Sequence, residues 1–387
     1  MDFPKAVDAE RQELVSILKA LITQDTTNPP GNESKAVEVI RKFFERHRIR
    51  YRIFEKDRGR ENIIGYVGSG SPVLIIPVHT DVVPAGDGWK TDPFKPTVRS
   101  GKIYGRGATD NKGPLSCALI AAKIFKSREK SMKGTLVIAC VADEERGSEY
   151  GMKYLLRSKR ISGDYAIVPD LENRMGKIAI GEKGLLFLKV ISFGKQAHAS
   201  TPHFGVNAID NMLDFLIEFR RWRYKHTSNV LFSGPTKNLG VISGGLAPNM
   251  VPAQCEARLD FRYLPGTKKQ DIIRDVKKMF AEVRRNNRHA KFDLEVIDDQ
   301  KPFVEKRKSV LTKSLSKNIT SVAGMTPEIY GSSGTTLAKP LAEAGVITAA
   351  LGPGDPGTAH TANEYIRIAE LVKFTKVLCM TAGDVLS

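Results

Sequence analysis

Histidine and acidic residues follow several apolar runs of this sequence, at points where buried strands would end. The groups are His79-Thr80-Asp81 after residues 73–78, Asp143-Glu144-Glu145 after residues 135–142, Asp170 after residues 165–168, and His360 after residues 346–351 and a glycine-rich stretch. A further carboxylate, Asp110, precedes a helical pattern that starts near Lys112. In open α/β sheets, ligands bind in the crevice at the carboxyl ends of the strands. These segments could therefore bring imidazole and carboxylate groups to one place.

The spacing of His79 and Asp81 favours a metal site over isolated structural roles. On a strand, residues two apart lie on the same side, so Asp81 can accept a hydrogen bond from the His79 imidazole and fix its metal-binding tautomer. Each group also has a simpler interpretation when taken alone. A lone histidine is often structural, Asp110 could cap a helix, and adjacent acids such as Glu144 and Glu145 are usually solvated. The H-x-D spacing raises the metal interpretation above these alternatives.

The types of the candidate ligands indicate which ions would bind. The set consists of two neutral imidazoles and three carboxylates, from His79, His360, Asp110, Glu145 and Asp170. Two divalent cations with one hydroxide would balance its charge. Nitrogen and oxygen ligands without thiolate suit Zn²⁺, and Co²⁺ and Mn²⁺ are compatible with them. Glu144 is then left beside the ligand Glu145, as a group that could act on the attacking water.

The elements around these groups alternate between helices and strands. Periodicity predicts helices over residues 8–23, 33–48, 112–126, 147–156, 309–323, 335–344 and 364–382, and strands over 51–54, 62–67, 72–78, 135–142, 165–168 and 346–351. The central strands are almost continuously apolar, as strands buried on both faces of a sheet are. We therefore predict the α/β class, a sandwich with helices on both faces of a largely parallel sheet.

A different pattern begins near residue 184. Strands are predicted over residues 185–193, 238–242, 255–264 and 291–297, and helices over 206–223 and 268–285. The order strand-helix-strand-strand-helix-strand is typical of a ferredoxin-like α+β domain. We therefore predict one α/β domain, residues 1–183 and 300–387, interrupted by a small insertion, residues 184–299.

Composition narrows the class of protein. The 387 residues carry a formal net charge of +17, but much of the excess lies on predicted helices that also carry acids, so we expect no nucleic-acid partner. The longest apolar runs, residues 73–78 and 136–142, are too short to span a membrane. The cysteines are dispersed and the first residues show no secretory signal, so we expect a cytoplasmic protein with reduced cysteines.

Several stretches of the chain together resemble the acetylornithine deacetylase/succinyl-diaminopimelate desuccinylase family, which includes aminoacylases, carboxypeptidase G-type enzymes and cytosolic dipeptidases. They are HTDVVPAGDGWKTDPFKPTVRSGKIYGRGATDNKGPL, ADEERGSEYG, GEKG, AHAS-TP-GVNAI, NMVP, LDFRYLPG and GTAHTANEY, in the family's order over residues 8–380. The resemblance implies a zinc-peptidase-like three-layer sandwich as catalytic domain. It also implies that the inserted domain serves as lid and dimerisation domain of a homodimer.

The resemblance also assigns roles within the metal site. It implies that His79 and Asp170 bind one zinc ion, that Glu145 and His360 bind the other, and that Asp110 bridges them. It further implies a cis peptide bond after Asp110. Asp81 resembles the carboxylate that supports His79, and Glu144 resembles the general base.

Further roles fall in or near the inserted domain. His198 resembles a histidine that reaches the partner subunit's site and stabilises the oxyanion. Asn249 and Arg262 resemble residues that hold the free carboxylate of the substrate, and Gly334 and Thr335 resemble residues that contact it.

One stretch departs from the family's deacylase pattern. Where deacylases carry an acid and an arginine after Gly-Gly-Thr, this chain has Leu337 and Lys339. We expect a metal-dependent amidohydrolase that cleaves a small anionic N-acyl amino acid. The alternative is a carboxypeptidase or dipeptidase with the same mechanism and a short peptide as substrate.

Overall fold

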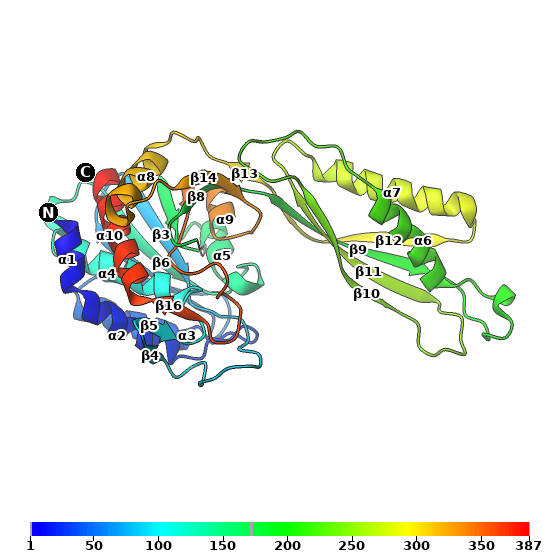
Figure 1. Cartoon of the computed structure of the whole chain (residues 1–387), viewed down its shortest axis with the longest axis horizontal. Coiled ribbons are helices and arrows are strands. Elements are labelled where there is room, and N and C mark those ends of the chain that lie inside the picture. Colours follow the sequence, from blue (N-terminus) through cyan, green and yellow to red (C-terminus); the bar gives the residue numbers. More distant parts are fainter. Residues whose placement is uncertain (1, 171–172, 387) are drawn as a thin grey trace. The chain divides into compact units, whose positions relative to one another are not determined.

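The computed structural model describes residues 2–170 and 173–386, and the chain divides into two compact units (Figure 1). The first unit comprises Met1–Ile180, Glu305–Tyr330 and Thr336–Ser387, and the second comprises Gly181–Val304 and Gly331–Thr335. The second unit thus contains the whole stretch 184–299 that the sequence predicts as an insertion, together with a short segment from later in the chain.

The central sheet is mixed, with the strand order β1-β2-β6-β3-β7-β15-β8-β13, and β14 also pairs with β8. Its strands are β1 (Arg50–Glu55), β2 (Glu61–Gly68), β3 (Val73–His79), β6 (Thr135–Val141), β7 (Tyr165–Val168), β8 (Lys177–Glu182), β13 (Phe303–Val304), β14 (Glu328–Ser332) and β15 (Ile347–Ala350). The neighbouring strands β6, β3, β7 and β15 are parallel. Antiparallel pairing joins β1 to β2, β2 to β6, and β8 to β15. The predicted α/β class is confirmed, although the sheet has antiparallel strands outside its parallel centre.

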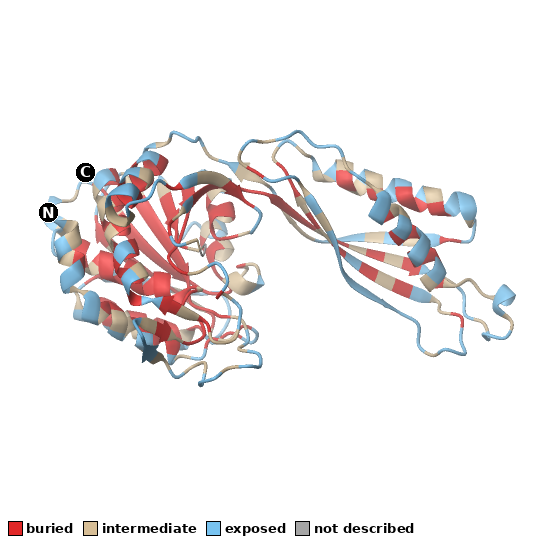
Figure 2. Ribbon diagram, in the orientation of Figure 1, coloured by how far each residue is buried: buried red, intermediate tan, exposed pale blue. Residues whose placement is uncertain are grey.

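Burial explains why the central strands have nearly continuous apolar sequences. Every residue of β3 after Val73 is buried, and so is every residue of β6 after Thr135. Figure 2 shows this buried centre, with exposed residues concentrated on the helices and loops around it. Removing both faces of a strand from water favours apolar residues at every position. The polar residues that follow these strands are therefore placed at the edge of a rigid core.

Helices cover the sheet on both faces. They are α1 (Phe3–Ala9), α2 (Arg11–Ile22), α3 (Ser34–Arg46), α4 (Lys112–Lys126), α5 (Met152–Arg157), α8 (Val310–Ala323), α9 (Ala338–Glu343) and α10 (Ile368–Val385). α4 packs on β2, β3 and β6 and contacts α10, whereas α9 packs on β7 and β15 and contacts α5. Figure 1 shows α4, α8 and α10 on one side of the sheet and α5 and α9 on the other. This layered arrangement is the one predicted from the alternation of elements.

The first unit also contains a small second sheet that was not predicted. One of its strands occupies the start of a predicted helix. Its order is β16-β5-β4, formed by β16 (Tyr365–Arg367), β5 (Lys102–Tyr104) and β4 (Thr97–Arg99). The predicted helix over 364–382 therefore begins later, at Ile368, because Tyr365–Arg367 pair with a strand more than 250 residues earlier in the chain. Likewise α9 begins at Ala338 rather than at residue 335.

The second unit has the element order β9-α6-β10-β11-α7-β12, which is the predicted order. The elements are β9 (Gly184–Phe193), α6 (Ala208–Arg221), β10 (Thr236–Gly244), β11 (Gln254–Tyr263), α7 (Lys269–Asn286) and β12 (Lys291–Gln300). The sheet order is β10-β11-β9-β12, and all pairs are antiparallel. A core that includes Phe215, Phe261 and Phe280 joins the helices to the sheet. This topology is ferredoxin-like.

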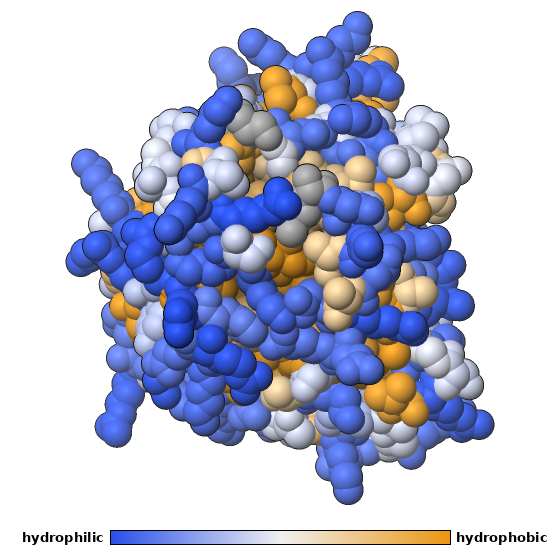
Figure 3. Space-filling view, turned by 90° about the vertical axis from the view of Figure 1, so that its left-hand side faces the viewer, coloured by the Kyte–Doolittle hydropathy of each residue, from blue (hydrophilic) through white to orange (hydrophobic). Residues whose placement is uncertain are grey.

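The surface is mainly hydrophilic on the side where α1 and α10 lie, with small apolar patches between charged side chains (Figure 3). All four cysteines are buried and unpaired: Cys117, Cys140, Cys255 and Cys379. Among the described residues, no helix combines the length and the apolar character that crossing a bilayer requires.

Candidate metal centre

Parallel register aligns the ends of the strands that precede the candidate ligands. His79, the last residue of β3, lies opposite Val141 of β6, and Val168 of β7 lies opposite Ala350 of β15. The polar segments that follow consequently emerge at one edge of the sheet. Seven of the predicted site residues meet at this edge: His79, Asp81, Asp110, Glu144, Glu145, Asp170 and His360.

The imidazole of His79 is buried and is oriented through both of its nitrogens. Nδ1 lies 2.9 Å from the backbone carbonyl oxygen of Asp81 and 3.5 Å from the carboxylate Oδ1 of the same residue. Nε2 lies 2.9 Å from Oδ1 of Asp110 and 3.5 Å from Oδ1 of Asp170. When Nδ1–H donates to the carbonyl, the lone pair of Nε2 faces the carboxylates, as a metal ligand requires. The nearer acceptor is thus the backbone of Asp81, and not the carboxylate that the H-x-D pattern predicted.

The two oxygens of Asp110 face different histidines. Oδ1 lies 2.9 Å from Nε2 of His79, and Oδ2 lies 3.1 Å from Nε2 of His360. The same Nε2 of His360 lies 3.3 Å from Oε2 of Glu145. Two groups of ligand atoms therefore share Asp110, one with His79 and Asp170, the other with His360 and Glu145. A carboxylate that divides its oxygens in this way is suited to bridge two cations.

Two buried carboxylate oxygens at the centre have no hydrogen-bond partner in the described part of the chain. They are Oε1 of Glu145 and Oδ2 of Asp170, one from each group. Leaving such atoms unpaired in the interior is costly, so each points to a partner that the described residues do not supply. Ligand atoms of His79, Asp110 and Glu145 lie within 4.8 Å of one another, and so do those of His79, Glu144 and Asp170. The donor set and its unpaired oxygens fit divalent cations.

The electrostatics of the centre favour the protonated form of several groups when no cation is bound. Burial, with a contribution from the charge of Asp170, raises the pKa of Glu144 well above its usual value. Burial likewise raises the pKa of Glu145 and of Asp170. Hydrogen bonds to Asp110 and Glu145 raise the pKa of His360 to about 10. Cations bound here would replace these protons and offset the repulsion between the carboxylates.

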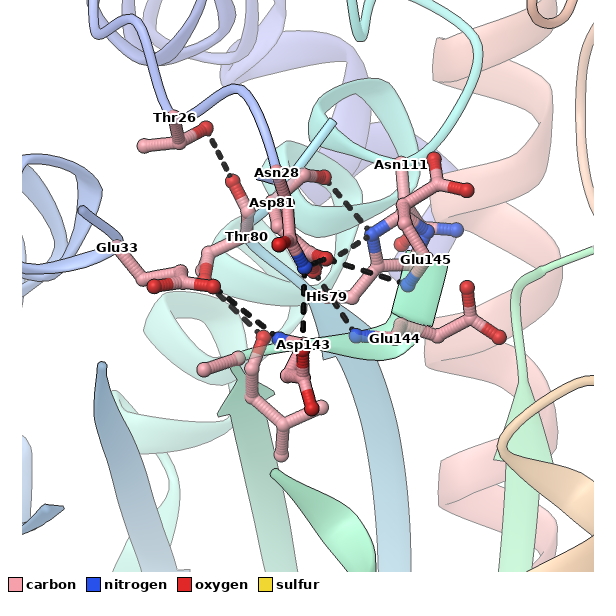
Figure 4. Close-up of polar contacts among 12 residues, drawn as sticks. Thr26, Asn28, Glu33, His79, Thr80, Asp81, Asn111, Asp143, Glu144 and Glu145 are labelled. Atoms are coloured by element: carbon pink, nitrogen blue, oxygen red, sulfur yellow. Dashed lines mark hydrogen bonds and ion pairs between the residues drawn. The ribbon is translucent and has the colours of Figure 1, made fainter. Parts of the chain in front are cut away.

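Glu144 and Glu145 lie on a single 3-10 turn, Glu144–Arg146, which is separated from the end of β6 by two residues. The carboxylate of Asp81 holds this turn, because Oδ1 accepts the backbone N–H of Glu144 at 3.1 Å and Oδ2 accepts that of Glu145 at 3.2 Å. Figure 4 shows the side chains of Glu144 and Glu145 leaving the turn in different directions. Adjacent glutamates can therefore serve the centre in two different ways.

The loop that carries Asp110 is held by a buried acid that the sequence analysis did not single out. Glu364 accepts the backbone N–H groups of Gly107, Thr109 and Asp110 at 3.0, 2.7 and 3.0 Å. It also pairs with Arg106 at 2.7 Å. The only sequence signal was its position in the GTAHTANEY stretch that contains His360.

The residue after Asp110 contributes as well. The Asp110–Asn111 peptide bond is cis, as the family resemblance implied. Nδ2 of Asn111 donates to the carbonyl oxygen of Pro169 at 2.7 Å and lies 3.2 Å from Oδ1 of Asp170. Asn111 therefore orients the segment that presents Asp170.

The remaining five predicted site residues lie in the second unit. Four of them form two pairs, and Gly334 adjoins the second pair in the sequence. In the first pair, the loop of His198 is hydrogen-bonded to that of Asn249, since the N–H of Ala199 donates to the carbonyl of Asn249 at 3.1 Å. Nδ1 of His198 accepts from the N–H of Ser200 at 3.1 Å. In the neutral ring, Nε2 of the exposed His198 is therefore the protonated nitrogen and a potential donor.

The second pair is Arg262 and Thr335. Nη1 of Arg262 donates to Oγ1 of Thr335 at 3.4 Å, and the other arm of the guanidinium pairs with Asp260 at 3.0 Å. Gly334, beside Thr335, is exposed, and its N–H donates to Ser332 at 3.0 Å.

The residues that depart from the deacylase pattern are both buried. Leu337 is 1% exposed and Lys339 is 4% exposed. Burial raises the pKa of Asp170, and the nearby backbone N–H of Leu337 acts against that rise. Leu337 therefore lies next to the metal centre, and both residues belong to the first unit.

Comparison with known proteins shows what the chain as a whole is similar to. A family model, Peptidase family M20/M25/M40, matches residues 75–384. A probable succinyl-diaminopimelate desuccinylase of Staphylococcus aureus is 29% identical, over 95% of this chain and 96% of that protein. The structure of an M20 family metallo-carboxypeptidase from Sulfolobus solfataricus has a TM-score of 0.80 at 20% identity and covers 97% of this chain and 99% of its own. A dinuclear metal-binding M20 peptidase of Bacillus subtilis has a TM-score of 0.74 at 14% identity, with 98% and 99% covered.

Proposed function

Because this chain belongs to Peptidase family M20/M25/M40, we propose that it is a two-metal amidohydrolase that removes the acyl group from an N-acylated amino acid. It is a metal-dependent hydrolase that acts on amide bonds, as its family and its relatives are. The finer proposal concerns the substrate. It is a small anionic N-acyl amino acid of the acetylornithine or succinyl-diaminopimelate type, which agrees with the desuccinylase relative.

The observation that carries the two-metal proposal is the division of the Asp110 oxygens between His79 and His360. His79 and Asp170 would hold one cation, His360 and Glu145 the other, and Asp110 would contact both. Zinc suits this donor set best, and cobalt and manganese also accept it. When bound, the cations would polarise the amide carbonyl and make water more acidic.

Glu144 is the residue we assign to proton transfer. Burial raises its pKa well above the ordinary value of a glutamate, which favours a group that takes up a proton and later releases it. In this assignment an oxygen of Glu144 takes a proton from the attacking water and later gives it to the leaving amine. Asp81 supports the assignment, since it fixes the turn that presents Glu144.

The second unit would supply substrate recognition and the oxyanion donor. Its proposed roles are lid and dimerisation domain. Nε2–H of His198 would donate to the oxyanion in the partner subunit's site, and its tautomer in the neutral ring supports that role. Asn249, Arg262, Gly334 and Thr335 would bind the free carboxylate end of the substrate, a task for which the guanidinium fork is suited.

A second candidate function is a carboxypeptidase or dipeptidase activity with the same chemistry. Leu337 and Lys339 favour it, because they replace the acid and arginine of the deacylase pattern, and both are buried.

A product-amine assay separates the two functions. The purified protein is loaded with Zn²⁺, Co²⁺ or Mn²⁺ and offered N-acetyl amino acids, N-succinyl amino acids and dipeptides. We expect the highest kcat/KM on the N-acyl substrates. Hydrolysis of dipeptides alone would replace the first function by the second, and no hydrolysis of any amide with any of the metals would overturn both.

A further inference from the structure

The side-chain amide of Asn28 lies between two buried carboxylates (Figure 4). Nδ2 donates to Oδ2 of Asp81 at 2.9 Å and to Oδ1 of Asp143 at 3.1 Å. Asn28 is 4% exposed, and both carboxylates are buried. An amide NH₂ has two N–H groups, so it can satisfy two acceptors at once without adding charge. Asn28 therefore joins two acids that would otherwise face each other across a site from which water is excluded.

These two acids fix opposite sides of the turn that carries Glu144 and Glu145. Asp81 accepts the backbone N–H groups of both glutamates. Asp143 directly precedes Glu144 and has the left-handed backbone conformation, with φ of 64°. Its Oδ2 accepts the N–H of Tyr150 at 3.2 Å, beyond the turn. A shift of either carboxylate would therefore move the peptide groups from which the two glutamates project.

Asn28 is itself placed by backbone hydrogen bonds to the segment after β3. Its N–H donates to the carbonyl of Val82 at 2.9 Å, and the N–H of Val82 donates to the carbonyl of Thr26 at 3.2 Å. Oγ1 of Thr26 donates to the carbonyl of Thr80 at 2.6 Å. The amide is thus anchored to the same strand end that carries His79 and Asp81.

The charge around Asn28 explains why a neutral donor is needed. Arg60 is the cation of this network: it pairs with Glu33 through Nε at 2.6 Å and with Asp143 through Nη2 at 3.0 Å. The N–H of Asp143 also donates to Glu33 at 3.2 Å. One guanidinium faces two carboxylates here, and Asp81 adds a third on the far side of Asn28, where the His79 imidazole lies 3.5 Å from it. Uncompensated buried carboxylates repel, and a hydrogen-bond donor between them lowers that cost.

We propose that Asn28 is a positioning residue of this hydrolase, which holds Asp81 and Asp143 together and so sets the position of Glu144 and Glu145. The inference rests on the proposed function, in which Glu144 transfers the proton and Glu145 binds a cation. Asn28 acts through the two aspartates and touches neither substrate nor metal. Substitution of Asn28 should therefore lower kcat and leave KM unchanged.

Two substitutions separate this role from simple packing. Asn28→Asp has nearly the same shape but replaces the donor by a carboxylate, whereas Asn28→Ala removes the side chain and adds no charge. If Asn28 only filled space, the alanine variant would be the more damaged. The proposed role predicts the reverse: with full metal occupancy, Asn28→Asp should lose about 100-fold in kcat and Asn28→Ala about 10-fold, at unchanged KM, the range usual for groups that support a metal site.

Asn318 provides a matched control. It lies on α8, is 1% exposed, and its Nδ2 donates to Ser314, Thr381 and Asp384 at 3.2, 3.1 and 3.1 Å. Asn318→Asp therefore also places a buried carboxylate against a second carboxylate, that of the exposed Asp384, but away from the metal centre. It should lower the thermal unfolding temperature while leaving kcat unchanged.

The measurements are kcat, KM and metal content for each variant, with amide hydrogen exchange as the second observable. In Asn28→Ala the N–H groups of Glu144 and Glu145 should exchange about ten-fold faster than in the wild type, and in Asn318→Ala they should not change. The exchange experiment decides the question if Asn28→Asp does not fold. Wild-type kcat in both Asn28 variants, or an alanine variant worse than the aspartate variant, overturns the proposal. An inactive Glu144→Gln beside fully active Asn28 variants would refute this inference alone, whereas an active Glu144→Gln would refute the proposed function.

Discussion

The carboxylate of Asp81 accepts the backbone N–H of Glu144 at 3.1 Å. Asp81, two residues after His79, thus fixes a turn that lies more than 60 residues later in the chain. Although burial alone would raise its pKa, hydrogen bonds with His79, Asn28 and Glu144 hold the pKa of Asp81 below its ordinary value. Asp81 is therefore an ionised acceptor that links the end of β3 to the turn that follows β6 by hydrogen bonds.

Asp81→Asn tests this relationship. The amide keeps the shape but presents an NH₂ group to donors that need an acceptor, so the turn should lose one of its hydrogen bonds. We expect a loss of 10–100-fold in metal affinity or in kcat, by analogy with other residues that support metal ligands. Zinc titration and steady-state kinetics measure the two quantities. Unchanged values for both would show that the turn keeps its position without Asp81.

Asp110→Ala should weaken both metal positions together. One carboxylate serves both groups of ligands, and its removal leaves two cations with less negative charge between them. Elemental analysis after dialysis should give fewer than two metal ions per subunit, and activity should be lost. Full occupancy with full activity in this variant is incompatible with a bridging Asp110.

Glu144→Gln should separate metal binding from proton transfer. The amide has the size of the acid but no basic oxygen of comparable strength. We expect the variant to retain its metal while kcat falls by about 10²–10⁴, the usual contribution of general acid–base catalysis. Turnover close to that of the wild type would assign the proton to another group.

The metal-free protein should show a defined pH dependence through His360. The acids Asp110 and Glu145 raise its pKa from 6.5 to about 10, so the folded state binds this proton more tightly than the unfolded state. The resulting contribution to the free energy of unfolding is complete below pH 6.5 and is lost as the pH rises to about 10. Urea unfolding of the metal-free wild type and of His360→Gln should therefore show a difference that shrinks over this range.

Saturating zinc provides the control for that experiment. The cation takes the place of the proton on His360, so the difference between the two proteins should depend much less on pH between these limits. A difference that grows with pH in the metal-free proteins would contradict the pairing of His360 with the two acids.

His198→Ala tests the proposed dimer together with the oxyanion donor. The variant should bind metal normally and lose about 10²–10³ in kcat, the usual cost of one oxyanion donor. Mixing it with Glu144→Gln should restore activity, because one hybrid site would combine an intact Glu144 with an intact His198 of the other chain. If subunits exchange and the mixture stays inactive, His198 does not act across subunits.

Local sequence determined much of the first unit and the types of the candidate ligands. Apolar runs such as residues 73–78 and 135–142 predict buried parallel strands, and parallel strands end at one edge. His79, Glu145 and Asp170 follow such runs closely, so the order of the elements along the chain was enough to predict their convergence. The alternation of strands and helices in the second unit likewise indicated its topology.

Tertiary structure alone decided how these groups are held. Glu364 accepts three backbone N–H groups from a loop more than 250 residues earlier, and Asn28 reaches an aspartate more than 100 residues later. No local pattern marks such partners, because a hydrogen bond between distant segments depends on how the chain packs and not on spacing along it. Spacing also could not show that the carbonyl of Asp81, rather than its side chain, is the nearer acceptor for His79, because both groups belong to the same residue. The sequence determined which chemical groups reach the edge of the sheet, and packing decided which backbone and side-chain atoms orient them.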